Sequence, residues 1–135
     1  MGNLSAFINP APVVEEKDVI ISERFKDEKG NIVPFRIKSI TQEQNAAITK
    51  ACKRQIKVNG MVQEKVDYSE VSRRLIVEAC VEPNFHAKEI CDAYGTMNPY
   101  EVPTKMLRSG EYSKLVEEIN RLSGFDVDLV EEAKN

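Results

Sequence analysis

Two short stretches near the N-terminus alternate between apolar and polar residues, and this period of two limits the fold more than any other feature of the chain. Their apolar members are Val19, Ile21 and Phe25 in residues 19–26, and Val33, Phe35 and Ile37 in residues 33–38. Between the stretches, Gly30 can adopt the positive φ that a chain reversal needs. The pattern predicts a β-hairpin with one apolar face. Pro34 has no N–H to give to a sheet, so its strand is expected to lie at an edge or to turn that side outward.

An isolated hairpin is barely stable in water, so its apolar face must pack on other elements. Helix signals fill the rest of the chain: capping patterns begin at Thr41 and Asp67, and a first-turn proline follows Asn98. The helix that begins near Asp67 is expected to carry Cys80 on its apolar face and to end at Pro83. Later helices are expected over residues 87–94 and 112–122. The order of signals predicts an α+β fold, mainly α, in which an N-terminal β-hairpin packs on a small bundle of short helices.

One segment has two interpretations. Asn59-Gly60 is the strongest two-residue turn signal in the chain, and Ile56, Val62 and Val66 flank it. A second small hairpin and a loop between two helices fit this pattern equally well.

The length of 135 residues suits a single domain with one modest core. Residues 1–18 are predicted to form a flexible N-terminal arm, residues 19–125 the globular domain, and residues 126–135 an acidic C-terminal tail. Both ends carry a few apolar residues that a partner could bind. They are Leu4, Phe7 and Ile8, which would share one face of a helix, and Leu129 and Val130 in the tail.

Neither catalysis nor cofactor or metal binding is indicated by the pattern of polar residues. His86 is the only histidine, and it falls in an expected loop. Cys52, Cys80 and Cys91 lack paired spacing, so they are expected to be buried, reduced thiols. No apolar run approaches the roughly 20 residues that cross a bilayer, and no secretory signal begins the chain. We therefore expect a cytoplasmic protein that is not an enzyme and does not bind membranes.

Charge is unevenly distributed along the chain, although the net charge is only −3. Residues 36–57 hold six basic residues against one acid, and the last part of the chain is acidic. An ordinary solvated helix face explains the basic cluster; a surface for an acidic partner, or for the acidic tail of a second copy, explains it too. Nucleic acid is an unlikely partner, because no exposed aromatic residues are interleaved to stack on bases. The candidate partner-binding residues in this cluster are Lys50, Lys53, Arg54 and Lys57.

Several blocks of the sequence, in one order, resemble a known family. They run from Ile21-Ser22-Glu23-Arg24-Phe25 through Cys80-Val81-Glu82-Pro83-Asn84-Phe85 and Ala93-Tyr94-Gly95-Thr96-Met97 to Met106-Leu107-Arg108-Ser109-Gly110-Glu111-Tyr112 and Leu122-Ser123-Gly124-Phe125. The chain is similar to the XkdN-like tail assembly chaperones of long-tailed bacteriophages and prophages.

The resemblance implies a protein that binds the tape measure protein in the bacterial host cell and helps the tail tube protein to polymerise around it, without a cofactor. It also implies that a longer, frameshifted product could be made, because Ala133-Lys134-Asn135 can be encoded by a slippery run of adenines. The alternative from the residues alone is a small regulatory or nucleic-acid-binding module that uses the basic segment 36–57.

Overall fold

The computed structural model describes residues 2–11 and 14–125 and has an α+β fold. Its main sheet is antiparallel, with the strand order β1-β2-β5. The strands are β1 (Glu16–Val19), β2 (Phe35–Lys38) and β5 (Cys80–Glu82). Val19 lies opposite Phe35, so the predicted N-terminal hairpin is confirmed. β1 begins at Glu16, within the range predicted to be the arm.

The position of β2 corrects the expectation from Pro34. β2 is the middle strand of the sheet, between β1 and β5, and not an edge strand. Pro34 lies one residue before β2 begins, where it does not interrupt the pairing of Phe35 with Val19. The edge-strand alternative was wrong because the regular part of the strand is shorter than the alternating pattern and begins only after Pro34.

The outer part of the first hairpin is a long loop with its own local turn. Lys26 bridges to Ile32, and Gly30 has a φ of 85°, as its place in the turn requires. The side chain of Asp27 accepts hydrogen bonds from the backbone N–H groups of Lys29 and Asn31, both at 2.9 Å. These bonds close the turn without any contribution from the core.

Three longer helices follow; the first two begin where the sequence places a cap, and the third begins at Ser109, three residues before the expected start at residue 112. They are α2 (Gln42–Ala51), α3 (Tyr68–Ala79) and α6 (Ser109–Leu122). Thr41 and Gln44 form a reciprocal capping box at the start of α2. The carboxylate of Asp67 accepts hydrogen bonds from the N–H groups of Ser69 and Glu70 at the start of α3.

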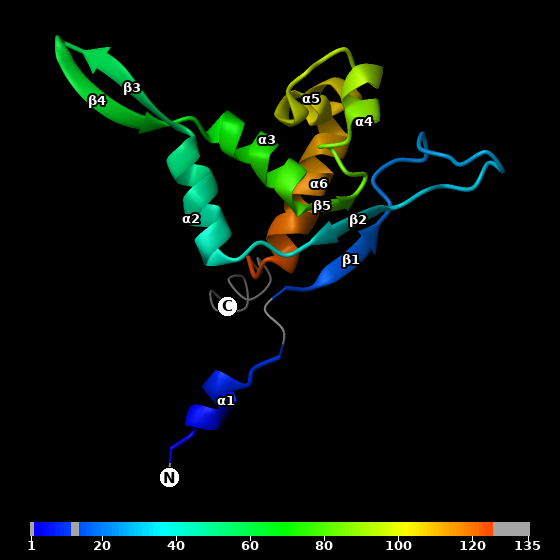
Figure 1. Ribbon diagram of the computed structural model, residues 1–135, viewed down its shortest axis with the longest axis horizontal. Coiled ribbons are helices and arrows are strands. Elements are labelled where there is room, and N and C mark those ends of the chain that lie inside the picture. The colour runs from blue at the N-terminus through cyan, green and yellow to red at the C-terminus, as the bar shows by residue number, and fades with distance from the viewer. Residues whose placement is uncertain (1, 12–13, 126–135) are drawn as a thin grey trace, which may run out of the picture.

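Short helical segments complete the fold. They are α1 (Leu4–Ile8), α4 (Lys88–Ala93), the 3₁₀ turn η1 (Pro99–Glu101) and α5 (Val102–Met106). Gly95 closes α4 with a φ of 67°, and the Asn98 side chain caps η1 at the N–H of Tyr100. Figure 1 shows α1 well away from the other helices, at the end of the N-terminal arm.

The core forms around α3, which contacts β5 of the sheet and the helices α2, α5 and α6, while α6 also contacts β2 (Figure 1). Its fully buried side chains come from β2, α3, α5, α6 and the loop after β5, and they include Ile37, Ile76, Phe85, Val102, Leu115 and Ile119. The predicted packing of the hairpin on a small helix bundle is therefore observed.

The end of α3 differs from the sequence-based expectation. The helix ends at Ala79, and Cys80 begins β5 instead of continuing the apolar face of the helix. Cys80 pairs with Ile37 of β2, so the segment before Pro83 completes the sheet. The helical spacing of apolar residues did not reveal this change, because that spacing places Cys80 on a buried helix face and Cys80 is also buried in the strand.

Candidate functional site

The most prominent surface feature is a second hairpin, formed by β3 (Lys53–Val58) and β4 (Met61–Val66). The structure therefore decides between the two interpretations of this segment. Asn59 and Gly60 form the turn with φ values of 54° and 79°, the left-handed values that a two-residue hairpin turn needs. In Figure 1 this hairpin projects from the body of the domain, beyond the end of α2. Every residue from Lys53 to Lys65 is exposed.

The two faces of this hairpin differ in character. Directly opposed residues of antiparallel strands share a face, so the printed register assigns each side chain. We call one side the ribbon face; it consists of Arg54, Ile56, Val58, Met61, Gln63 and Lys65. The opposite side consists of Lys53, Gln55, Lys57, Val62, Glu64 and Val66. The ribbon face is the more apolar of the two and carries no acid.

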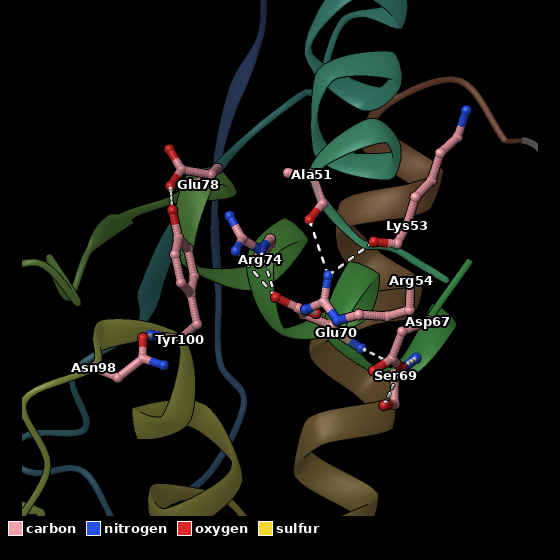
Figure 2. Close-up of polar contacts among 10 residues, drawn as sticks. All are labelled: Ala51, Lys53, Arg54, Asp67, Ser69, Glu70, Arg74, Glu78, Asn98 and Tyr100. Atoms are coloured by element: carbon pink, nitrogen blue, oxygen red, sulfur yellow. Dashed lines mark hydrogen bonds and ion pairs between the residues drawn. The ribbon is translucent and has the colours of Figure 1, made fainter. Parts of the chain in front are cut away.

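The base of the hairpin is fixed to α3 by a polar network, shown in Figure 2. Its centre is the carboxylate of Glu70, in the first turn of α3, which accepts hydrogen bonds from Arg54 and Arg74. Arg54 also donates to the backbone carbonyls of Ala51 and Lys53, at 3.4 and 3.1 Å. One acid thus holds together the end of α2, the start of β3 and the middle of α3.

The network continues from Arg74 along the same face of α3, by way of Tyr100, to Glu78. The Arg74 guanidinium lies 4.6 Å from the centre of the Tyr100 ring, in a cation–π contact. The Tyr100 hydroxyl donates to Glu78 at 2.9 Å, as Figure 2 shows. Burial and this bond to a carboxylate raise the pKa of Tyr100. These groups are engaged with one another, which gives the network a structural role.

A hollow of about 300 Å³ opens where the ribbon face meets α3. Arg54, Ile56 and Lys65 line it from the hairpin, and Tyr68 lines it from the first turn of the helix. The Tyr68 side chain is 72% exposed, although its ring is large and apolar. An exposed tyrosine beside a basic, apolar strand pair is typical of a surface that binds another protein.

The basic segment 36–57 does not form one surface. Arg36 lies in β2, where it pairs with Glu16 and Asp18 at 3.1 and 2.9 Å. Figure 1 shows β2 and the β3–β4 hairpin on opposite sides of the domain. Of the four candidate cations, Lys53, Arg54 and Lys57 lie in the hairpin, and Lys50 lies in the last turn of α2. Arg54 is already paired with Glu70.

The candidate residues in the N-terminal arm form the apolar side of α1. Leu4, Phe7 and Ile8 are 67%, 79% and 64% exposed, so the short helix leaves all three accessible. The candidates Leu129 and Val130 lie outside the described residues.

A second candidate surface, which we did not anticipate from the sequence, is a furrow along α6. It has a volume of about 530 Å³, and Tyr112, Val116 and Phe125 supply its apolar part. A smaller hollow beside Ile40 shares Asn120 and Phe125 with it, so the two lie next to each other. The only sequence signal was the width of the apolar stripe on this helix. Tyr112 and Val116 are only partly buried against the core, and their outer sides face the furrow.

The single histidine and the three cysteines lie apart from one another in the fold. His86 is exposed in the loop after β5, with its Nε2 atom 3.2 Å from Glu78. The three cysteines are free and buried, as predicted, and burial raises the pKa of the Cys80 thiol to about 12. Among the described residues, no three His, Cys, Asp or Glu side chains come together to hold a metal ion. Within the same part of the chain, no helix is long and apolar enough to span a bilayer.

Known proteins with similar sequences show the family of this chain. The family model described as "Phage XkdN-like tail assembly chaperone protein" matches residues 4–134. Protein YqbN of Bacillus subtilis (strain 168) is 39% identical over 96% of this chain and 92% of its own length. The phage-like element PBSX protein XkdN of the same strain is 34% identical over 96% of this chain and 93% of its own length.

A solved structure agrees with these sequence matches. The crystal structure of the protein YqbN superposes with a TM-score of 0.77, at 34% identity, over 93% of this chain and 99% of the other. Sequence and fold therefore match over nearly the whole length of both proteins. The chain belongs to the XkdN-like family of phage tail assembly chaperones.

Proposed function

We propose that this tail assembly chaperone binds the tape measure protein, keeps it soluble, and releases it as the tail tube protein polymerises around it. Family membership supports a role in tail assembly. The observation that carries the binding function is the β3–β4 hairpin, which presents Ile56, Val58, Met61 and Val62 to solvent, from 37% to 69% exposed. A projecting, exposed apolar surface of this kind marks a site of protein interaction.

The physical demand on such a chaperone fits this surface. A long helical chain exposes apolar stripes until its partners arrive, and cover by a small, negatively charged protein suppresses its aggregation. A hairpin that projects from the domain can reach a partner without rearrangement of the core. In this role the protein turns over no substrate and acts in the cytoplasm of the bacterial host.

The two ends of the chain are proposed as auxiliary contacts. Leu4, Phe7 and Ile8 on α1 offer a small apolar face at the end of the arm. Residues 126–135 add acids and the apolar residues Leu129 and Val130. We propose that the domain folds without either segment and that both contribute to partner handling.

Coexpression of the chain with the tape measure protein from the same genome tests the proposed function. We expect the tape measure protein to be insoluble alone, and to become soluble and to copurify when the chain is present. A chain with Met61→Asp should solubilise it less, because a charge replaces a 69% exposed apolar side chain at the tip of the hairpin. Met97→Asp is the matched control, because Met97 is fully accessible outside the hairpin.

If the tape measure protein stays insoluble with the unaltered chain, the proposed function is wrong. Salt-dependent binding of the purified chain to duplex DNA, without binding to the tape measure protein, would favour a nucleic-acid-binding module instead.

A further inference from the structure

We infer that the ribbon face of the β3–β4 hairpin binds an acidic, amphipathic segment of the tape measure protein, with one of its apolar side chains in the hollow beside Tyr68. This inference rests on the proposed function and adds the site and the chemistry of the bound segment. It follows from the exposure of the face, its charge, and the hollow at its base.

The hairpin leaves an apolar face uncovered, which a partner would bury. Two strands without a third strand or a helix against them are marginally stable in water. Here Ile56, Val58 and Met61 lie together on one face and remain 37%, 40% and 69% exposed. The base, in contrast, is held firmly, because Arg54 pairs with Glu70 and the Asp67 N–H donates to the Cys52 carbonyl at 2.9 Å. A fixed base and an uncovered apolar face suit a surface that is preorganised for binding.

The positive charge of the hairpin favours an acidic partner. Residues 53–66 carry four cations and one acid, within a chain whose net charge is −3. The single acid, Glu64, lies on the opposite side, so the ribbon face has no group that repels a carboxylate. Because Glu70 already neutralises Arg54, Lys65 is the cation on this face that is available to a bound acid. A segment in which acids alternate with apolar residues matches both properties.

The hollow at the base gives the bound segment a fixed position. Ile56 and Tyr68 supply apolar contact in a space of about 300 Å³, and Lys65 lies at its margin. An apolar side chain in the hollow places the neighbouring carboxylate of the same segment near Lys65. Anchoring side chains that fill pockets contribute most of the affinity at such interfaces.

Two other occupants fit less well. The hairpin of a second copy carries the same positive charge, so direct pairing of two hairpins is repelled. Nucleic acid would need several free cations and aromatic residues for stacking, whereas the ribbon face offers Lys65 and no aromatic side chain within its strands.

An array of overlapping peptides from the tape measure protein of the same genome tests this inference. Peptides of about 15 residues are long enough to cover the roughly 20 Å of each strand. The array also carries a peptide of residues 121–135 of this chain, and a labelled DNA duplex is measured separately. We expect the labelled full chain to bind peptides that combine acids with apolar residues, and binding to weaken as salt concentration rises.

Two substitutions on the ribbon face connect this binding to the surface. Lys65→Glu and Met61→Asp should each weaken peptide binding by about tenfold or more. The matched controls, Lys29→Glu in the first hairpin and Met97→Asp, change exposed residues outside the face and should leave binding unchanged. Circular dichroism of all four variants checks that the fold is retained.

The outcomes separate this inference from the proposed function. If the tape measure protein copurifies but Lys65→Glu and Met61→Asp bind every peptide as the unaltered chain does, the ribbon face is not the site and the inference is overturned. Preference for basic peptides would overturn the inference as well. Tighter binding of the 121–135 peptide than of any tape measure peptide would assign the face to a second copy of the chain. Tighter binding of DNA than of the peptides would also overturn the inference. Absence of copurification would refute the proposed function itself.

Discussion

Arg54 and Glu70 form an ion pair across the junction between β3 and α3. The Glu70 side chain is only 12% exposed, whereas that of Arg54 is 51% exposed, so the acid is held in the domain and the cation reaches back to it from the hairpin. The pair joins the start of the hairpin to the first turn of α3 (Figure 2). The proposed binding surface therefore depends on a contact between its own Arg54 and Glu70 of α3.

Glu70→Ala should loosen the hairpin and lower the stability of the domain. The substitution leaves both Arg54 and Arg74 without their carboxylate, and the loss of a partly buried, charged partner costs about 1–3 kcal/mol. Urea unfolding measures this loss, and hydrogen exchange should be faster at residues 53–66. Glu64→Ala, which removes an exposed acid of the hairpin, is the control. Unchanged exchange in the hairpin of Glu70→Ala would show that the ion pair does not hold it.

Phe35→Ala tests the packing of the first hairpin on the helices. Phe35 is 2% exposed in the core, and its ring centre lies 5.4 Å from that of Phe25. Truncation of a buried phenylalanine costs about 3–5 kcal/mol. Val33→Ala, at a residue that is 38% exposed, should cost about 1 kcal/mol or less. Equal unfolding midpoints for the two variants would contradict the observed role of β2 in the core.

The arrangement of the core was predictable because its signals are local. The period of two around Val19 and Phe35, the cap at Thr41 and the cap at Asp67 each depend on neighbours within a few residues, and each appears in the structure. The third strand was not predictable in this way. Cys80 joins β2 through its pairing with Ile37, a contact between residues far apart in the sequence.

The candidate site was predictable only in part, for a related reason. The turn signal at Asn59-Gly60 fitted a hairpin and a loop between helices equally well, and no local pattern showed whether a hairpin here would be covered or would project from the domain. The charge cluster combined residues that the fold separates, such as Arg36 and Lys57. The hollow at Tyr68 and the furrow along α6 arise from the relative placement of whole elements.

Glu111→Gln should change how stability depends on pH. Hydrogen bonds from Arg24, then those from Ser22 and the backbone of Arg108, lower the pKa of Glu111 to about 2 from its ordinary 4.5. Because the folded-state pKa is depressed, this contribution is fully present above about pH 4.5 and is lost as the pH falls towards 2. Urea unfolding at several pH values should therefore show a difference between the two proteins that shrinks over this range. A constant difference would show that Glu111 does not titrate as proposed.

The cysteines should be unreactive in the folded protein. Cys52, Cys80 and Cys91 are all buried, and burial raises the pKa values of Cys52 and Cys80, so little thiolate is available to react. With a disulfide reagent near neutral pH, we expect negligible reaction in buffer and three equivalents in denaturant. Fast reaction of one thiol in buffer would mean that the core around it opens readily.

We propose that the β3–β4 hairpin is the surface that binds the tape measure protein. Hydrogen exchange of the chain alone and in complex with the tape measure protein tests this proposal, because exchange reports each segment separately. We expect slower exchange in the complex at residues 53–68. Protection confined to residues 109–125 beside the furrow, or to residues 2–11, with no change at residues 53–68, would contradict it.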